Sequence, residues 1–272
     1  MGDARALLTL AVPSYNRRAE LERCLRSVAR EAPGLPVLVI DDGSSDGTAQ
    51  MIAERYPWAA CIRLEKNCGP AAARNRALES VETPYVAFFD SDVEMKRGWY
   101  ETVLAALDPF TVLACRVDRP DGTMEWGPRR TRFWGGSTSC GPEEADAGSS
   151  NNLIAPVELA RAIGGFSEEL SFYFEDTFFC ICVRDAGGRV RYVDGAAVTH
   201  YHDSRPSLDR IRRFSRNRAF AMVRLSRHPR LMSAVQILLG ILTGAGALAR
   251  LHGGAAWVGL RGTLRGIADA SD

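Results

Sequence analysis

The sequence predicts an α/β fold in which a mostly parallel sheet carries helices on both faces. Short apolar runs that suit buried strands alternate with longer segments whose apolar residues recur at helical spacing. Such alternation is typical of parallel sheets covered by helices. The chain has 272 residues, 46% of them apolar, which is enough for a substantial core and too much for intrinsic disorder.

Turn and capping residues set the borders of the predicted elements. The first strand, over 7–12, ends at a proline, and apolar side chains recur at helical spacing over 20–29. The strand over 37–40 ends in an acidic turn, after which Asp46 or Thr48 can cap a helix that continues to residue 56. The same criteria predict strands over 59–64, 85–89 and 190–193, helices over 71–81, 99–107 and 175–185, and an ordered segment over 156–163.

Residues 116–150 interrupt this alternation. The stretch is rich in Gly, Pro, Arg and Ser and has no regular apolar period. Because long irregular segments inside compact domains are usually functional, we predict a lid or binding loop there.

Cysteine usage and net charge exclude several classes of protein. The seven cysteines form no CxxC pair, which disfavours a zinc site and predicts reduced thiols in a cytoplasmic protein. The formal net charge of +1 disfavours a dedicated nucleic-acid binder.

Two acidic clusters follow predicted strands. Asp41 and Asp42 come after the strand over 37–40, and Asp90, Ser91 and Asp92 come after the strand over 85–89. We expect both clusters on one rim, because the carboxyl ends of parallel strands share an edge of the sheet. Mg²⁺ or Mn²⁺ with substrate phosphates would satisfy Asp90 and Asp92, whose burial without partners would be costly. A solvated turn or a helix-capping acid pair is the alternative.

Four motifs follow one another in the first part of the chain: Val12–Asn16, Val39–Ser44, Asn67–Asn75 and Phe88–Asp92. In this order they resemble glycosyltransferase family 2. Later motifs that match are Gly164–Phe166, Phe174–Asp176 and Val198–His200, so the resemblance covers about residues 7–203. It implies a GT-A fold and an inverting enzyme that uses a nucleotide-diphospho-sugar. Acids that family members commonly carry are replaced by Ser167 and Phe178, which leaves the acceptor subgroup open.

The resemblance implies a nucleotide-sugar site at the strand ends. Tyr15, next to Pro13, would border the base, and Asp42 would accept the imide hydrogen of uracil or thymine. Arg74 would reach the diphosphate; from spacing alone, an exposed helix arginine is the alternative. The implied nucleotide-sugar-binding set is Pro13, Tyr15, Asp42, Arg74, Asp90 and Ser91.

The resemblance also implies a metal site and a base. Asp92, Asp90 and His200 would ligate Mg²⁺ or Mn²⁺, which neutralises the departing nucleoside diphosphate. A lone histidine at a strand end is otherwise a hydrogen-bonded structural residue, and His202 is the reserve ligand. Asp176 would deprotonate the acceptor, while Glu175 would orient the acceptor or support the loop.

A GT-A catalytic domain is expected over 1–204, with a nucleotide-sugar half to about 115 and an acceptor half over about 116–204. A basic and apolar helical extension follows over 205–272. Residues 201–230 hold nine Arg and two Asp, a charge of +7 that leaves −6 for the remainder. Ser207 can cap a basic amphipathic helix there, and the uncharged run over 231–249 is barely long enough to span a bilayer.

This pattern predicts peripheral membrane contact, or an acidic carrier protein bound through Arg205–Arg230. Packing on the sheet or in a homodimer is the alternative, and some of the arginines would serve the leaving group. No nucleic acid is needed to explain the patch. We expect a cytoplasmic protein, peripheral at the inner face of the cell membrane.

The expected function is metal-dependent inverting transfer of a sugar from a UDP- or dTDP-sugar to a hydroxyl or amine. The acceptor would be a cell-envelope glycan, a lipid-linked glycan or a natural-product intermediate, free or bound to a carrier protein. One alternative is a haloacid-dehalogenase-type phosphotransferase, because Phe88–Val93 also resembles its nucleophile loop. The other is a catalytically silent sugar-binding scaffold.

Overall fold

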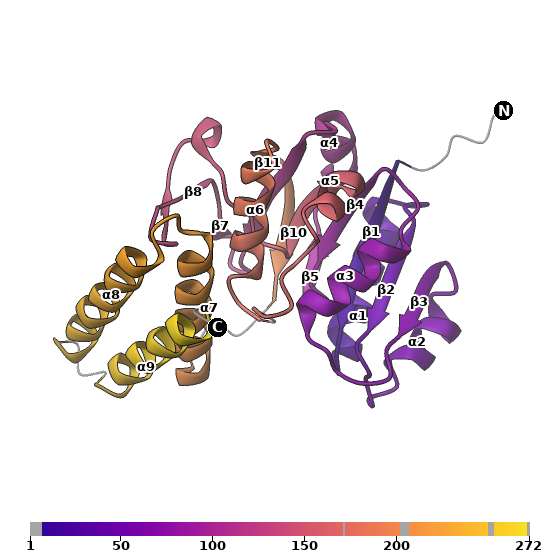
Figure 1. Cartoon of the computed structure of the whole chain (residues 1–272). Coiled ribbons are helices and arrows are strands. Elements are labelled where there is room, and N and C mark those ends of the chain that lie inside the picture. Colours follow the sequence, from indigo (N-terminus) through magenta and orange to yellow (C-terminus); the bar gives the residue numbers. More distant parts are fainter. Residues whose placement is uncertain (1–6, 171, 202–206, 250–252, 271–272) are drawn as a thin grey trace.

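A computed structural model describes residues 7–170, 172–201, 207–249 and 253–270. Within them, one sheet has the strand order β3-β2-β1-β4-β10-β6-β11-β5, with β7 paired to β6, and β8 pairs with β9 (Figure 1). The strands are β1 (Leu8–Ser14), β2 (Val37–Asp41), β3 (Ala59–Arg63), β4 (Tyr85–Phe89), β5 (Val93–Met95), β6 (Thr111–Asp118), β7 (Met124–Trp126), β8 (Arg129–Thr131), β9 (Ser137–Ser139), β10 (Asn152–Pro156) and β11 (Arg189–His200).

Helices cover both faces of the sheet, as predicted. The buried side chains of α1, α2 and α4 pack with one set of strand residues, and those of α3, α5 and α6 pack with the other. The neighbours Phe88 and Phe89 illustrate the division, because each is buried in a different core. The α-helices are α1 (Arg18–Glu31), α2 (Thr48–Arg55), α3 (Pro70–Ser80), α4 (Trp99–Ala106), α5 (Val157–Ala162), α6 (Glu175–Asp185), α7 (Leu208–Leu225), α8 (Pro229–Ala249) and α9 (Gly253–Asp269).

Most predicted elements of the first 107 residues are confirmed within two residues at each end. The helix predicted over 175–185 is α6 with the same bounds, and Asp46 accepts a hydrogen bond from the Thr48 amide at the start of α2. Ser207 caps α7 by accepting a hydrogen bond from the Arg210 amide. All seven cysteines are free thiols.

The prediction of an irregular segment over 116–150 was only partly right. Strand β6 extends into it, and three strands of three residues each, β7, β8 and β9, cross it. Strand β11 is also longer than the predicted 190–193, because its pairing with β6 is interrupted between Val193 and Val198 and then resumes. Short strands and interrupted strands carry little periodic signal, which explains both differences.

The C-terminal helices α7, α8 and α9 lie together at the opposite end of the molecule from α2 and β3 (Figure 1). The predicted apolar face of α7 is only partly buried, because Leu208 and Phe214 are exposed whereas Met222 is covered. No helix among the described residues has the length and apolarity to cross a bilayer.

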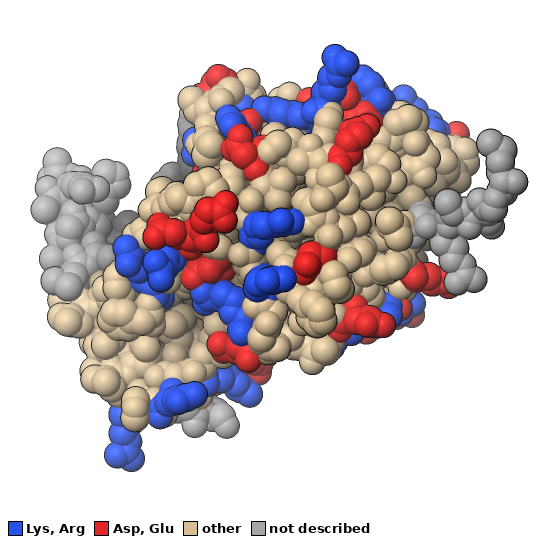
Figure 2. Space-filling model, turned by 90° about the horizontal axis from the view of Figure 1, so that it is seen from above, with Lys and Arg blue, Asp and Glu red and all other residues tan. Residues whose placement is uncertain are grey.

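The basic stretch is partly neutralised within the protein. On α7, Arg212 and Arg213 pair with Asp209, and Arg216 pairs with Asp269 of α9. Basic and acidic side chains are interspersed on the face drawn in Figure 2. Arg205, the first residue of the predicted partner-binding stretch, and His202 lie outside the described residues.

Close backbone contact between α7 and α9 depends on Gly266. A Cβ at this position would lie 2.0 Å from the Arg216 carbonyl oxygen, closer than van der Waals radii allow. At Gly259 on the same helix, a Cβ would meet only side-chain atoms, at 3.5 Å or more.

We predict opposite effects of Gly266→Ala and Gly259→Ala. The first should lower the free energy of unfolding by about 1–3 kcal/mol, because α9 must move away from α7. The second should raise it by up to about 1 kcal/mol, since alanine favours the helix. Urea denaturation measures both, and a Gly266→Ala protein as stable as the Gly259→Ala protein would refute this packing.

Candidate active site

The carboxyl ends of four strands that run in the same direction, β1, β2, β4 and β11, bring the predicted site residues to one edge of the sheet. The pairing of strands β5 and β11 brings two of the metal-ligand candidates, Asp92 and His200, together. Strand β5 runs antiparallel to β11 and places Val93 opposite His200. The Tyr201 amide also donates to the Asp92 carbonyl oxygen at 2.9 Å. His200 therefore meets Asp92 because of backbone pairing, although 108 positions separate them in sequence.

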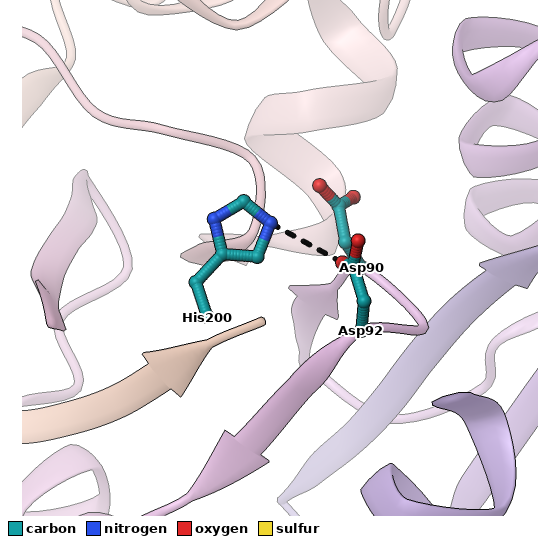
Figure 3. A group of neighbouring side chains, drawn as sticks. All are labelled: Asp90, Asp92 and His200. Atoms are coloured by element: carbon teal, nitrogen blue, oxygen red, sulfur yellow. Dashed lines mark ion pairs between the residues drawn. The ribbon is translucent and has the colours of Figure 1, made fainter. Parts of the chain in front are cut away.

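Asp90, Asp92 and His200 form a candidate metal centre (Figure 3). One oxygen from each carboxylate and a ring nitrogen of His200 all lie within 4.8 Å of one another. His200 Nε2 is 3.2 Å from Asp92 Oδ1. Two carboxylates and one imidazole suit a hard or borderline divalent cation such as Mn²⁺, and Mg²⁺ shares the carboxylate preference.

Two further residues that sequence reasoning missed surround the imidazole. The Nδ1 atom of His200 lies 3.2 Å from Glu125 Oε2 and 3.3 Å from Asn151 Nδ2. Burial lowers the pKa of His200, but its hydrogen bonds to Asp92 and Glu125 outweigh burial and raise the pKa to about 10. Glu125 lies on β7, inside the segment predicted to be irregular, and no pattern in that stretch distinguishes it.

Arg74 of α3 links Asp90 of the metal-ligand candidates to Glu175, the neighbour of the candidate base Asp176. Its guanidinium donates to Asp90 Oδ1 at 2.7 Å and to Glu175 Oε1 at 3.0 Å, and the residue is 2% exposed. Burial lowers the pKa of Arg74, but the charges of Asp90 and Glu175 raise it by more, so the pKa lies above the usual value for arginine. The exposed-helix interpretation of Arg74 is wrong, because the side chain crosses the site between two carboxylates.

Glu175 and Asp176 begin helix α6 after an unusual turn. Tyr173 and Phe174 both have positive φ angles, 71° and 73°, which cost about 1–3 kcal/mol each for such residues. Burial, followed by the charge of Asp176, raises the pKa of Glu175 to about 7. Burial also raises the pKa of Asp176, against hydrogen bonds from the Thr177 and Ser150 amides and the charge of Arg74.

Asn75 connects two of the sequence motifs. Its side-chain amide donates to the Phe166 carbonyl oxygen at 2.9 Å and accepts from the Phe166 amide at 2.8 Å. Gly165 has φ +71°, and a Cβ there would lie 2.5 Å from Asn75 Oδ1. The glycine turn is therefore required for α3 to hold the segment that leads to α6.

The residues predicted to bind the nucleotide lie at the ends of β1, β2 and β4. Tyr15 is 44% exposed beyond β1, next to half-buried Pro13, and Ser91 is buried between Asp90 and Asp92. Asp42 is buried, and its two oxygens accept the Cys68 and Gly69 amides at 2.8 and 2.9 Å. Asp42 thus holds the loop before α3, and each of its oxygens keeps a second lone pair for a ligand.

We predict that Arg74→Met costs about 3–5 kcal/mol of unfolding free energy at pH 7, because it leaves buried carboxylates without their cation. The loss should shrink as pH falls from 7 toward 5. Glu175 and Asp176 have raised pKa values in the folded protein, so the folded state takes up protons before the unfolded chain does. Denaturant titrations at pH 5, 7 and 8 measure this dependence.

Arg76→Met is the matched control, since Arg76 lies on the same helix and its side chain is exposed. It should change stability by no more than about 0.5 kcal/mol. A loss in Arg74→Met that does not vary with pH would contradict the assignment.

Comparison with known proteins supports a family assignment. The curated relatives include the pre-mycofactocin glycosyltransferase of Mycobacterium tuberculosis, 30% identical over 221 residues, which cover 74% of this chain and 44% of the relative. The putative teichuronic acid biosynthesis glycosyltransferase TuaG of Bacillus subtilis is 36% identical over 108 residues, 38% of this chain and 43% of the relative. The chain thus spans less than half the length of these relatives.

Solved structures share the fold. The mannosyltransferase PcManGT from Pyrobaculum calidifontis, in complex with GDP-Man and Mn²⁺, aligns with a TM-score of 0.61 at 17% identity, over 98% of this chain and 87% of that one. S. aureus TarS 1–349 in complex with UDP-GlcNAc aligns with a TM-score of 0.59 at 20% identity, over 88% and 72%. The family model for glycosyl transferase family 2 matches residues 9–179, more than half of the chain, and the chain therefore belongs to this family.

Proposed function

We propose that this protein is a metal-dependent inverting glycosyltransferase that moves a sugar from a UDP- or dTDP-sugar to an acceptor hydroxyl or amine. The observation that carries the proposal is the arrangement around Arg74. This one buried guanidinium joins Asp90 of the metal-ligand cluster to Glu175, next to the candidate base Asp176. In this proposal, the groups that stabilise the leaving group and the group that accepts the proton are neighbours.

The residues can perform transfer in a single displacement. A divalent cation held by Asp90, Asp92 and His200 would offset the charge of the departing diphosphate. Asp176 receives the proton of the attacking acceptor, and its raised pKa brings it closer to neutral pH, where proton acceptance is efficient. Glu175 fixes Arg74 and supports the turn before α6. An inverting path needs no covalent intermediate and therefore no nucleophilic side chain.

The proposed donor site uses the edge formed by β1, β2 and β4. Tyr15 borders the base, Asp42 accepts its imide hydrogen through a free lone pair, and Pro13 and Ser91 line the site. Structures with this fold include complexes with UDP and GalNAc, with UDP-GlcNAc and with GDP-Man, two of them also containing Mn²⁺. They support the class of donor, and the imidazole of His200 favours Mn²⁺ over Mg²⁺.

The acceptor is proposed more broadly, as a cell-envelope or lipid-linked glycan or a natural-product intermediate. The named relatives include both a teichuronic acid enzyme and a pre-mycofactocin enzyme. A peripheral contact with the inner face of the membrane is part of the proposal. Arg224, Arg227 and Arg230, and the apolar side chains Leu231 and Leu238, are all exposed on α7, on α8 and on the segment that joins them, a combination that suits anionic lipid. An acidic carrier protein or a second copy of the chain would use the same surface.

Family membership argues against the phosphotransferase alternative for Phe88–Val93. In the structure, Asp90 accepts a hydrogen bond from buried Arg74 and forms an ion pair with it, which holds the carboxylate in place and reduces its nucleophilicity. The silent-scaffold alternative predicts nucleotide-sugar binding without turnover.

We predict that Asp92→Ala and His200→Ala weaken Mn²⁺-dependent binding of UDP by at least about 100-fold. Loss of even an outer-shell residue typically costs 10–100-fold in metal affinity, so loss of a direct ligand should cost more. Isothermal titration with UDP and Mn²⁺, and again with Mg²⁺, measures the effect. Glu101→Ala, an exposed acid on α4, is the control that should bind as the wild type does. Equal binding by all variants would exclude this metal centre.

We also predict that Asp176→Asn lowers the rate of UDP release from the best UDP-sugar substrate by about 10²–10⁴-fold while UDP binding stays within threefold of wild type. Glu175→Gln should lower this rate by a smaller factor, because glutamine keeps the shape of the contact with Arg74. Screening UDP- and dTDP-sugars with Mn²⁺ identifies the substrate. A larger loss in Glu175→Gln than in Asp176→Asn would reverse the two roles, and a wild type that binds donors without any turnover would favour the scaffold.

A further inference from the structure

Asn217 of the C-terminal helix α7 holds the backbone that precedes the candidate base. Its side-chain Nδ2 lies 2.5, 2.9 and 2.8 Å from the carbonyl oxygens of Leu170, Phe172 and Tyr173. Asn217 is 3% exposed, so water does not compete readily for these contacts. The two hydrogens of one amide are thus shared among three carbonyl groups directly before Glu175.

This stretch of backbone lies outside the regular hydrogen bonds of helix α6. Tyr173 and Phe174 lie in the left-handed region, which turns the chain out of regular hydrogen bonding. Helix α6 begins directly after them, and the Phe178 amide of its first turn donates to the Phe174 carbonyl oxygen. Within the stretch, the Phe172 amide also donates to the Leu170 carbonyl oxygen. Without the Asn217 amide, the three carbonyls would lose a buried donor, and a turn with less strain would become accessible.

The orientation of the Asn217 amide is itself fixed. Arg216 donates from Nη1 to Asn217 Oδ1 at 2.9 Å, which directs Nδ2 toward the three carbonyls. The same nitrogen donates to the Glu169 carbonyl oxygen at 2.7 Å. Arg216 Nε and Nη2 lie 2.9 and 2.8 Å from Asp269 Oδ2 at the end of α9. A continuous set of polar contacts therefore runs from α9 through α7 to the turn.

We propose that Asn217 is a positioning residue, which sets the direction in which Glu175 and Asp176 enter the site. The inference rests on the proposed function for its catalytic consequence but not for its structural one. It assigns the C-terminal helices an indirect part in the reaction, in addition to any part in partner binding. Asn217 does not touch the substrate; it acts through the backbone that carries the base.

Hydrogen exchange tests the structural part without any activity. In Asn217→Ala, backbone amides over 172–177 should exchange at least tenfold faster than in the wild type, while those over 86–95 keep their protection. Val223→Ala removes buried side-chain volume from the same helix and serves as the control for general destabilisation. It should not accelerate exchange over 172–177 selectively. Equal exchange patterns in the two variants would overturn the proposal.

Kinetics test the catalytic part. Asn217→Ala should lower kcat for UDP release from a UDP-sugar by about 10–100-fold, with KM for the donor and the Kd for UDP with Mn²⁺ within threefold of wild type. Val223→Ala should keep wild-type kcat. A wild-type kcat in Asn217→Ala would refute the positioning role, whereas failure of the wild type to bind UDP would refute the proposed function and leave the exchange result standing.

A milder variant covers the case in which Asn217→Ala does not fold. Asp269→Asn weakens only the contact that orients Arg216, about 50 residues further along the chain. Like Asn217→Ala, it should accelerate exchange over 172–177 and lower kcat, each by a smaller factor. Wild-type exchange and wild-type kcat in this variant would contradict the set of contacts from α9 to the turn.

Discussion

The arrangement of the site depends on one buried cation. Arg74 lies in a part of the protein where Asp90, Glu175 and Asp176 would otherwise repel one another, and its two hydrogen-bonded carboxylates come from the turn after β4 and from α6. Removing a buried charge partner is far more costly than any exposed ion pair is stabilising. The guanidinium therefore determines how close the proposed donor and acceptor sites can lie.

Backbone pairing between strands fixes the positions of the other site residues. The register of β11 with β5 brings His200 to Asp92, and the register of β10 with β4 places Asn152 opposite Phe89, one residue from Asp90. Asn152 is fully buried and joins Trp99 of α4 to the Arg116 and Ala196 carbonyl oxygens, across the irregular part of β11. From the other side, α7 holds the turn before Asp176. The site is thus assembled from segments distant in sequence but fixed by neighbouring strands and helices.

The sequence predicted those parts of the structure whose residues show a clear local pattern, and it missed those that depend on contacts distant in sequence. Apolar runs that end at a proline or in an acidic turn identified β1, β2 and β4. The acidic turns indicated the shared edge, and the motifs pointed to Asp90, Asp92, Arg74 and His200. Glu125 and Asn151 were missed because they lie in or beside short strands without periodicity. Asn217 was missed because its role depends on α7 reaching a turn some 45 residues earlier, a tertiary contact that no spacing reveals.

The most direct test of the central claim is a crystal structure of the wild-type protein with UDP and Mn²⁺, with the ion located by its anomalous scattering. We expect one Mn²⁺ bound by Asp90, Asp92 and His200, with the diphosphate on its open side and Asp42 against the uracil. An ion or nucleotide bound elsewhere, with Asp90 and Asp92 left without a ligand, would contradict this expectation.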